Sequence, residues 1–147
     1  MADLTVKSTA FENNTLIPAK YTCDGDEVNP PLTVDGIPQG TKTLVLILDD
    51  PDAPMGTYDH WVVWNILPTG KIAEHTVPGT EGLTSAGQTA YVGPCPPSGT
   101  HRYFFKVYAL DTKLDLKANS RKKDVEQAMQ GHILAKGELV GLYKRGR

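Results

Sequence analysis

The sequence has little cysteine and no long hydrophobic segment. Its 147 residues include two cysteines, Cys23 and Cys95, and neither belongs to a C-x-x-C pair, which excludes the common zinc and dithiol motifs. We expect both to be reduced thiols. No apolar run approaches the roughly 20 residues of a membrane-spanning helix, and the N-terminal residues lack the apolar core of a secretory signal. The sequence therefore predicts a soluble, cytoplasmic chain without membrane insertion.

An excess of positive charge is also missing. Lys and Arg number 15 against 17 Asp and Glu, so no positive field favours binding of nucleic acid or of an anionic membrane surface. Neither a P-loop nor a G-x-G-x-x-G motif is present, and we expect no cofactor. The chain has 14 Gly and 11 Pro with 39% hydrophobic residues, which is typical of a loop-rich globular protein. Its length fits a single domain over residues 1–147.

What the sequence does contain is a series of short β-strand patterns between turn residues. Three segments are rich in β-branched and aromatic residues, at residues 43–48, 60–67 and 103–110. In the segment 60–67 both alternate sets of side chains are mostly apolar, so we expect a central strand with both faces covered. The spacing of the turn clusters favours antiparallel pairing. After Gly137, the run GELVGLYKR is short enough to form a closing strand.

One helix is expected, from about Lys123 to Leu134. Asp124, followed three residues later by Gln127, is typical of a helix start. Apolar residues recur at i, i+3, i+4, i+7 and i+8 on one stripe that would cover part of the sheet: Val125, Ala128, Met129, His132 and Ile133.

A pair of carboxylates follows the first predicted strand, in the run DDPDAP at residues 49–54. Asp50 and Asp52 are two residues apart, so in an extended chain both side chains point the same way. Two like charges on one side need a positive or donating group between them. Alternatively, each aspartate only closes an Asx-turn at the end of a strand, and the residues leave both interpretations open.

Two histidines at the ends of other strands are candidates for that group. His60 begins the predicted central strand, and a stiff loop at residues 93–99 leads into a strand on which His101 and Tyr103 share one face. If these groups converge, an aspartate beside a histidine favours the imidazolium form and fixes its tautomer. The histidines would then be positive donors with a pKa near or above the usual value of about 6.5. Such a pocket suits a phosphate or carboxylate head group.

Two other chemistries use the same residues. A metal site would take His60, His101 and an aspartate, but the short spacing of ligands on one element is absent. A hydrolase would use Ser98 or Cys95 as nucleophile with His101, but the sequence has no G-x-S-x-G motif. We therefore expect a binding protein without a metal, and not an enzyme.

Five motifs in order resemble the phosphatidylethanolamine-binding protein family, and most of all its bacterial and archaeal Raf kinase inhibitor-like (YbhB/YbcL-type) branch. They are YTCDGDEVNPPL, DDPDAP, HWVVWNI, GPCPPSGTHRYFFKVYAL and GHILAKGELVGLY, and the match runs from about residue 10 to residue 143. The resemblance implies a mainly β fold, in which a large antiparallel sheet packs against a smaller one. It also implies one or two short helices near the C-terminus and an anion-binding cavity at one end.

The resemblance further implies which residues bind the ligand. They are the two aspartates of DPDAP, the histidine at the start of HWVVWNI, the CPP wall, and the histidine and tyrosine of HRY: Asp50, Asp52, His60, Cys95, Pro96, Pro97, His101 and Tyr103. Family members bind phosphorylated or acetate-like head groups there, and some inhibit kinases or serine proteases. Prokaryotic members often form homodimers.

We therefore expect a non-enzymatic binding protein for small phosphorylated or other anionic ligands, a homodimer with a kinase or protease as candidate partner. The alternative is a kinase or serine protease inhibitor that acts through a surface loop, residues 76–85 or 93–100, with a vestigial pocket. Animal members continue into a C-terminal helix beside the cavity, whereas this sequence ends in KRGR. The resemblance thus implies a more open pocket.

Overall fold

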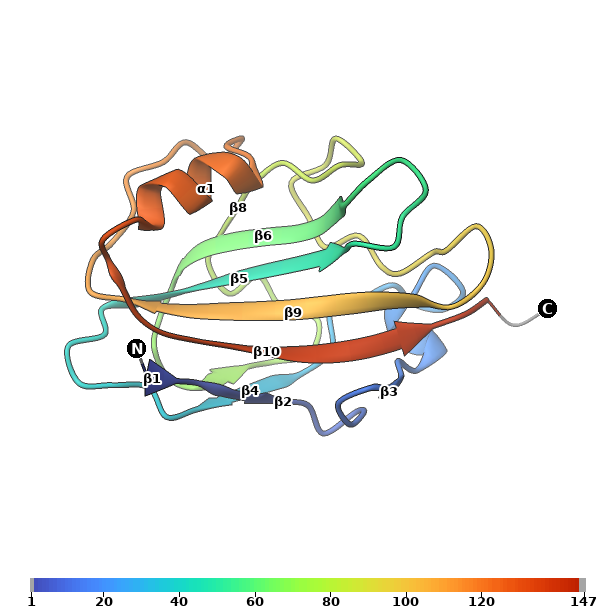
Figure 1. Cartoon of the computed structure of the whole chain (residues 1–147), viewed down its shortest axis with the longest axis horizontal. Helices are drawn as coiled ribbons and strands as arrows, with labels where there is room; N and C mark the ends of the chain where they lie inside the picture. Colours follow the sequence, from blue (N-terminus) through green and yellow to red (C-terminus); the bar gives the residue numbers. More distant parts are fainter. Residues whose placement is uncertain (1, 146–147) are drawn as a thin grey trace.

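Two β-sheets with a hydrophobic core between them form the fold in the computed structural model, which describes residues 2–145 (Figure 1). The larger sheet has the strand order β1-β10-β9-β5-β6-β8, with β3 also paired to β10, and the smaller has the order β2-β4-β7. The elements, in chain order, are β1 (Ala2–Asp3), β2 (Thr5–Lys7), β3 (Thr15–Leu16), the 3₁₀-helix η1 (Ala19–Tyr21), β4 (Leu32–Asp35), β5 (Thr43–Asp50), β6 (Tyr58–Ile66), β7 (Lys71–Ile72), β8 (Thr80–Glu81), β9 (His101–Leu110), α1 (Lys122–Met129) and β10 (Ile133–Tyr143). The predicted mainly β architecture of a larger and a smaller sheet is confirmed.

The long strands of the large sheet pair antiparallel, as the turn spacing predicts. β5 lies between β6 and β9, and β9 lies between β5 and β10. Among the strands that the structure describes, only the short β1 and β3 run parallel to their partner β10. Within residues 2–145, no helix is long and apolar enough to cross a bilayer.

The strand β6 is covered on both faces, as its sequence predicts. Trp61 and Val63 belong to the core between the two sheets, whereas Val62 and Trp64 pack on the opposite face beneath α1. β6 is nevertheless not at the centre of the sheet. It is the second strand from one edge, where only the two-residue strand β8 lies outside it. Its second apolar face is explained by the helix above it and not by a central position (Figure 1).

The helix α1 is shorter than the apolar stripe predicts. It begins at Lys122, where the Asp124 carboxylate accepts a hydrogen bond from the Arg121 backbone N–H at 2.9 Å, so Asp124 is the third residue of the first turn. It ends at Met129 because Gly131 adopts a left-handed φ of 81°, after which the chain enters β10. Of the last residues of the predicted stripe, His132 therefore lies in the turn and Ile133 begins the strand.

The closing strand β10 starts four residues before Gly137, where the sequence placed its beginning. Gly137 allows close packing, because a Cβ at this position would collide with the backbone carbonyl oxygen of Leu4. The Leu4 backbone N–H donates to the Lys136 carbonyl oxygen at 2.9 Å. At this point the chain passes from β1 in the large sheet to β2 in the small sheet.

Candidate functional site

A cavity of about 350 Å³ lies at the end of the large sheet where β5 ends and where β6 and β9 begin. Four buried side chains with polar groups face it: Asp50, His60, His101 and Tyr103. The rest of the lining is mostly apolar or backbone, from the turn after β5, the start of β6 and the loop before β9: Ala53, Pro54, Met55, Gly56, Tyr58, Val92, Gly93, Cys95, Pro96 and Pro97. These segments lie together because β6 and β9 run antiparallel to β5, so both strands begin at the end of the sheet where β5 ends.

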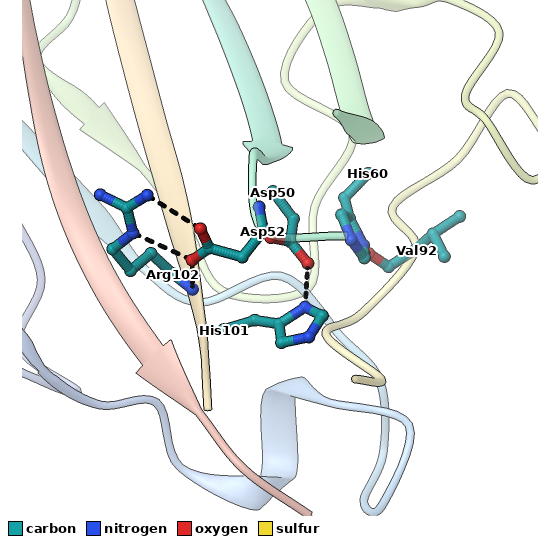
Figure 2. Close-up of polar contacts among 6 residues, drawn as sticks. All are labelled: Asp50, Asp52, His60, Val92, His101 and Arg102. Atoms are coloured by element: carbon teal, nitrogen blue, oxygen red, sulfur yellow. Dashed lines mark hydrogen bonds and ion pairs between the residues drawn. The ribbon is translucent and has the colours of Figure 1, made fainter. Parts of the chain in front are cut away.

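Asp50 and His101 form the closest polar contact in the cavity. Asp50 Oδ2 accepts a hydrogen bond from His101 Nδ1 at 2.6 Å, with side-chain exposures of 4% and 9% (Figure 2). Asp50 is the last residue of β5 and His101 the first of β9, the strand next to it in the sheet. A carboxylate accepts only, so it holds the proton of His101 on Nδ1 and leaves Nε2 as the other ring atom able to meet a ligand.

The second oxygen of Asp50 completes a turn. Asp50 Oδ1 accepts a hydrogen bond from the Asp52 backbone N–H at 2.7 Å, which is an Asx-turn. Both interpretations of the carboxylate therefore hold at Asp50, which closes the strand with one oxygen and orients a histidine with the other.

His60 is held by backbone. Its Nδ1 donates to the carbonyl oxygen of Val92 at 2.8 Å (Figure 2). Its ring packs beside Tyr58 and against the edge of Tyr103. Burial lowers the pKa of His60 below its usual value, although the Val92 hydrogen bond and the charge of Asp50 act in the other direction. The ring is therefore neutral at pH 7, with the proton on Nδ1 and a lone pair on Nε2. The expectation of two positively charged histidines is wrong for His60, because burial outweighs the nearby carboxylates.

Tyr103 contributes a hydroxyl that stays protonated. Burial, followed by the negative charge of Asp50, raises the pKa of Tyr103 well above its usual value. Its ring stacks with that of His101, with 6.4 Å between the ring centroids. The cavity therefore contains a phenol O–H in addition to the two imidazoles.

Asp52 points away from these groups. Its carboxylate accepts hydrogen bonds from the backbone N–H, Nε and Nη2 of Arg102, at 2.8 to 2.9 Å, and it is not among the residues that line the cavity (Figure 2). Hydrogen bonding to Arg102 lowers the pKa of Asp52 to about 2. The expectation that Asp50 and Asp52 point the same way is wrong, because β5 ends at Asp50 and Asp52 lies in the following turn. Alternation along β9 carries the signal for Arg102, which lies between His101 and Tyr103 and so faces the other way.

The loop that leads into β9, residues 93–100, forms one wall of the cavity and is called the wall loop below. It has the predicted position but contains a disulfide that was not predicted. Cys95, Pro96 and Pro97 all line the cavity, and Cys95 is joined to Cys23 by a disulfide with a Cα–Cα distance of 5.4 Å. The expectation of two reduced thiols is therefore wrong. The cysteines are 72 residues apart in the chain, and they meet because the segment after η1 packs against residues 91–95. That packing depends on tertiary structure and leaves no local pattern.

Several lining residues were not predicted from the sequence. Met55 is 98% exposed at the tip of the loop after β5, and Tyr58 begins β6 beside His60. Val92 supplies the carbonyl that orients His60. Tyr58 had a usable signal, since it lies two residues before His60 and so on the same face of an extended strand.

Comparison with known proteins agrees with this architecture. The family model described as phosphatidylethanolamine-binding protein matches residues 7–144. A UPF0098 protein of Methanothermobacter thermautotrophicus is 48% identical over 151 residues, which cover 97% of this chain and 100% of that protein. The chain belongs to the phosphatidylethanolamine-binding protein family.

Two solved structures show the same fold. A phosphatidylethanolamine-binding protein homologue from Chlamydia trachomatis has a TM-score of 0.95 and 38% identity, covering 99% of this chain and 100% of that chain. YbcL from E. coli, described as a member of the mammalian family, has a TM-score of 0.89 and 29% identity, again over 99% and 100% of the two chains. The likeness to YbcL agrees with the branch that the sequence motifs resemble.

Proposed function

We propose that the protein is a non-enzymatic binding protein whose cavity takes the phosphoryl or carboxylate head group of a small ligand. One observation carries this proposal: two imidazoles and a phenol, each with its other contacts already made, converge in one cavity. The Nε2 atoms of His60 and His101 become donors when their rings take up a proton, because Nδ1 of each ring already donates, to Val92 and to Asp50 respectively. Hydrogen bonds to an ionised ligand are the stronger kind.

The state of the two nucleophiles that the sequence offers supports binding rather than hydrolysis. Cys95 has no free thiol, because its sulfur is bonded to Cys23. Ser98 is exposed and does not belong to the residues that line the cavity. A nucleophilic mechanism needs the attacking group within hydrogen-bond reach of its base.

The resemblance extends this proposal to a kinase or protease partner and a homodimer, and the sequence extends it to a cytoplasmic location. For contact with a protein partner, the exposed residues 97–100 are better suited than residues 76–85. The second segment is held by backbone hydrogen bonds from Gly82, Leu83 and Ser85 to neighbouring elements.

The test is calorimetric titration of the full chain, as isolated with its disulfide, with inorganic phosphate, phosphoethanolamine and acetate. Asp50→Asn and His60→Ala should weaken binding by about tenfold or more, which is about 1.4 kcal/mol. Asp111→Asn is the matched control, since Asp111 also accepts a hydrogen bond from a histidine, His132, at 2.8 Å but lies outside the cavity. Unchanged affinity in both cavity variants would contradict the proposal. Inhibition of a kinase or protease that responds only to substitutions at residues 97–100 would favour the loop alternative.

A further inference from the structure

The disulfide Cys23–Cys95 is part of the cavity and not only of the fold. Cys95 lines the cavity beside Pro96 and Pro97, and it is exposed, whereas Cys23 is half-buried. Disulfides that are exposed to solvent are the ones that exchange readily with thiols. A thiolate therefore has access to this bond from the side of Cys95.

The disulfide also joins the wall loop to the segment around Cys23, and it is the last covalent link before the chain reaches His101. The loop is tied at its start, where the Gly93 N–H donates to Glu27 Oε2 at 3.0 Å and the Cys23 N–H donates to the Pro94 carbonyl oxygen at 3.1 Å. Residues 96–100 make none of the hydrogen bonds found between the described residues. Beyond Cys95, therefore, the segment is held by the packing of the buried Pro96, and the next hydrogen-bonded residue is His101, the first residue of β9.

The attachment continues to the polar groups of the cavity. The backbone N–H of Cys95 donates a hydrogen bond to the Tyr103 hydroxyl oxygen, and the Tyr103 ring stacks on that of His101. Pro96 and Pro97 follow Cys95 directly, so the position of the apolar wall depends on where the Cys95 backbone is held. The disulfide thus restrains one wall of the cavity relative to the histidines.

We propose that this disulfide is a redox-controlled clamp of the cavity, and that reduction by a dithiol loosens the wall and weakens the binding of anions. A thiolate of the reductant attacks Cys95 Sγ, a new S–S bond forms there, and Cys23 leaves as a thiolate that takes up a proton. The second thiol of the reductant then displaces Cys95. The reductant ends as its own disulfide, and two electrons and two protons have passed to Cys23 and Cys95. The effect on anions rests on the function proposed above.

Contacts other than the disulfide also hold the segments around Cys23 and Cys95 together. The Tyr91 hydroxyl donates to the Tyr21 carbonyl oxygen at 2.7 Å, and the hydrogen bonds of Gly93 and Cys23 hold the same two segments together. The long strands are paired along their length independently of Cys95. Reduction is therefore expected to loosen residues 95–100 while the sheets remain formed.

The experiment compares the full chain before and after dithiothreitol, well below its unfolding temperature, with thiols counted by alkylation and mass spectrometry. The ring resonances of His60, His101 and Tyr103 are followed by NMR without any anion, and phosphate binding is then measured by calorimetry. We expect reduction of both cysteines, shifted His101 and Tyr103 resonances, unshifted amides in the middle of β5 and β9, and about tenfold weaker binding of phosphate.

The double variant Cys23→Ser/Cys95→Ser tests the same loss of the disulfide without a reductant. It should match the reduced wild type in its resonances and its affinity, and it should not respond to dithiothreitol. Resistance of the native disulfide to dithiothreitol, identical resonances in the two states, or loss of the sheet amides on reduction would each overturn the clamp. If phosphate binds neither state, the proposed anion function fails, while the histidine and tyrosine resonances still decide whether the disulfide controls the cavity.

Discussion

Asp50 and His101 lie on neighbouring strands, and the carboxylate of the first accepts the Nδ1 proton of the second at 2.6 Å in an almost fully buried contact. This hydrogen bond determines which ring nitrogen of His101 faces the cavity. Because the carboxylate keeps a proton on Nδ1, Nε2 carries a lone pair in the neutral ring and donates to a ligand oxygen when the ring takes up a second proton.

Replacing Asp50 with Asn should release this restraint. The amide carries no charge, and its NH₂ group can turn toward the imidazole, so the Nδ1–H tautomer loses its advantage. Nitrogen NMR of the histidine rings should show one tautomer of His101 in the wild type and a mixture in Asp50→Asn. The same change at the exposed pair, Asp111→Asn, should alter only His132. A single unchanged tautomer of His101 in Asp50→Asn would show that the carboxylate does not orient the ring.

The buried His60 should make stability depend on pH. Burial lowers its pKa in the folded state, so between that value and the unfolded value of about 6.5 the unfolded chain binds more protons. The contribution of His60 to stability is therefore complete above pH 6.5 and is lost as the pH falls through the folded pKa. Urea unfolding between pH 5 and pH 8 should show this loss in the wild type, after correction for the acidic groups by difference from the variant His60→Asn.

The variant His60→Asn is suited to this comparison because its side-chain N–H can take the place of Nδ1–H in the hydrogen bond to Val92. His132→Gln, at an exposed histidine outside the cavity, is the control and should leave the wild-type slope unchanged. Equal slopes for wild type and His60→Asn would contradict the lowered pKa. Phosphate should shift the titration of His60 to higher pH, since an anion stabilises the protonated ring, and its affinity should rise as the pH falls.

Local patterns in the sequence were sufficient to predict the long strands, whereas the meeting of His60, His101 and Asp50 was a conditional expectation that the family resemblance made specific. β5, β6 and β9 each have a dense apolar pattern, and antiparallel connections bring their ends to one edge of the sheet. The strands of two or three residues have too few side chains to form a period. The neutral state of His60 and the direction of Asp52 were not predictable, because both depend on groups brought close by folding, namely Val92 and Arg102.

Asp49, the residue before Asp50, faces the other side of the sheet and attaches the helix. Its buried carboxylate lies 3.3 Å from Lys122 Nζ and 3.1 Å from Lys106 Nζ, and Lys122 also contacts Asp59 at 2.9 Å. Lys122→Met keeps most of the apolar length but leaves two carboxylates with less compensation. We expect a loss of about 1 to 3 kcal/mol in the free energy of unfolding.

The control for Lys122 is the neighbouring residue of α1. Lys123 is exposed, so Lys123→Met should change the free energy of unfolding by less than about 0.5 kcal/mol. Urea titrations of both variants decide the matter. Equal stabilities would mean that the ion pairs at the first turn of α1 contribute no more than surface pairs do.

Gly137 is the point at which the N-terminal segment crosses β10 on its way from the large sheet to the small one. Adding a Cβ by Gly137→Ala brings it against the carbonyl oxygen of Leu4, and backbone cannot move aside as a flexible side chain can. Leu4 is buried in the core between the sheets, and its N–H is bonded to Lys136, so the displacement should weaken both contacts. We expect a loss of about 1 to 3 kcal/mol, measured by urea unfolding, together with faster amide exchange at Leu4 and Val6. Because φ at Gly137 is not left-handed, the cost comes from the contact and not from the backbone conformation.

The exposed neighbour provides the comparison, and Glu138→Ala should be nearly neutral. A Gly137→Ala variant as stable as Glu138→Ala would mean that the two sheets tolerate a wider separation at this crossing.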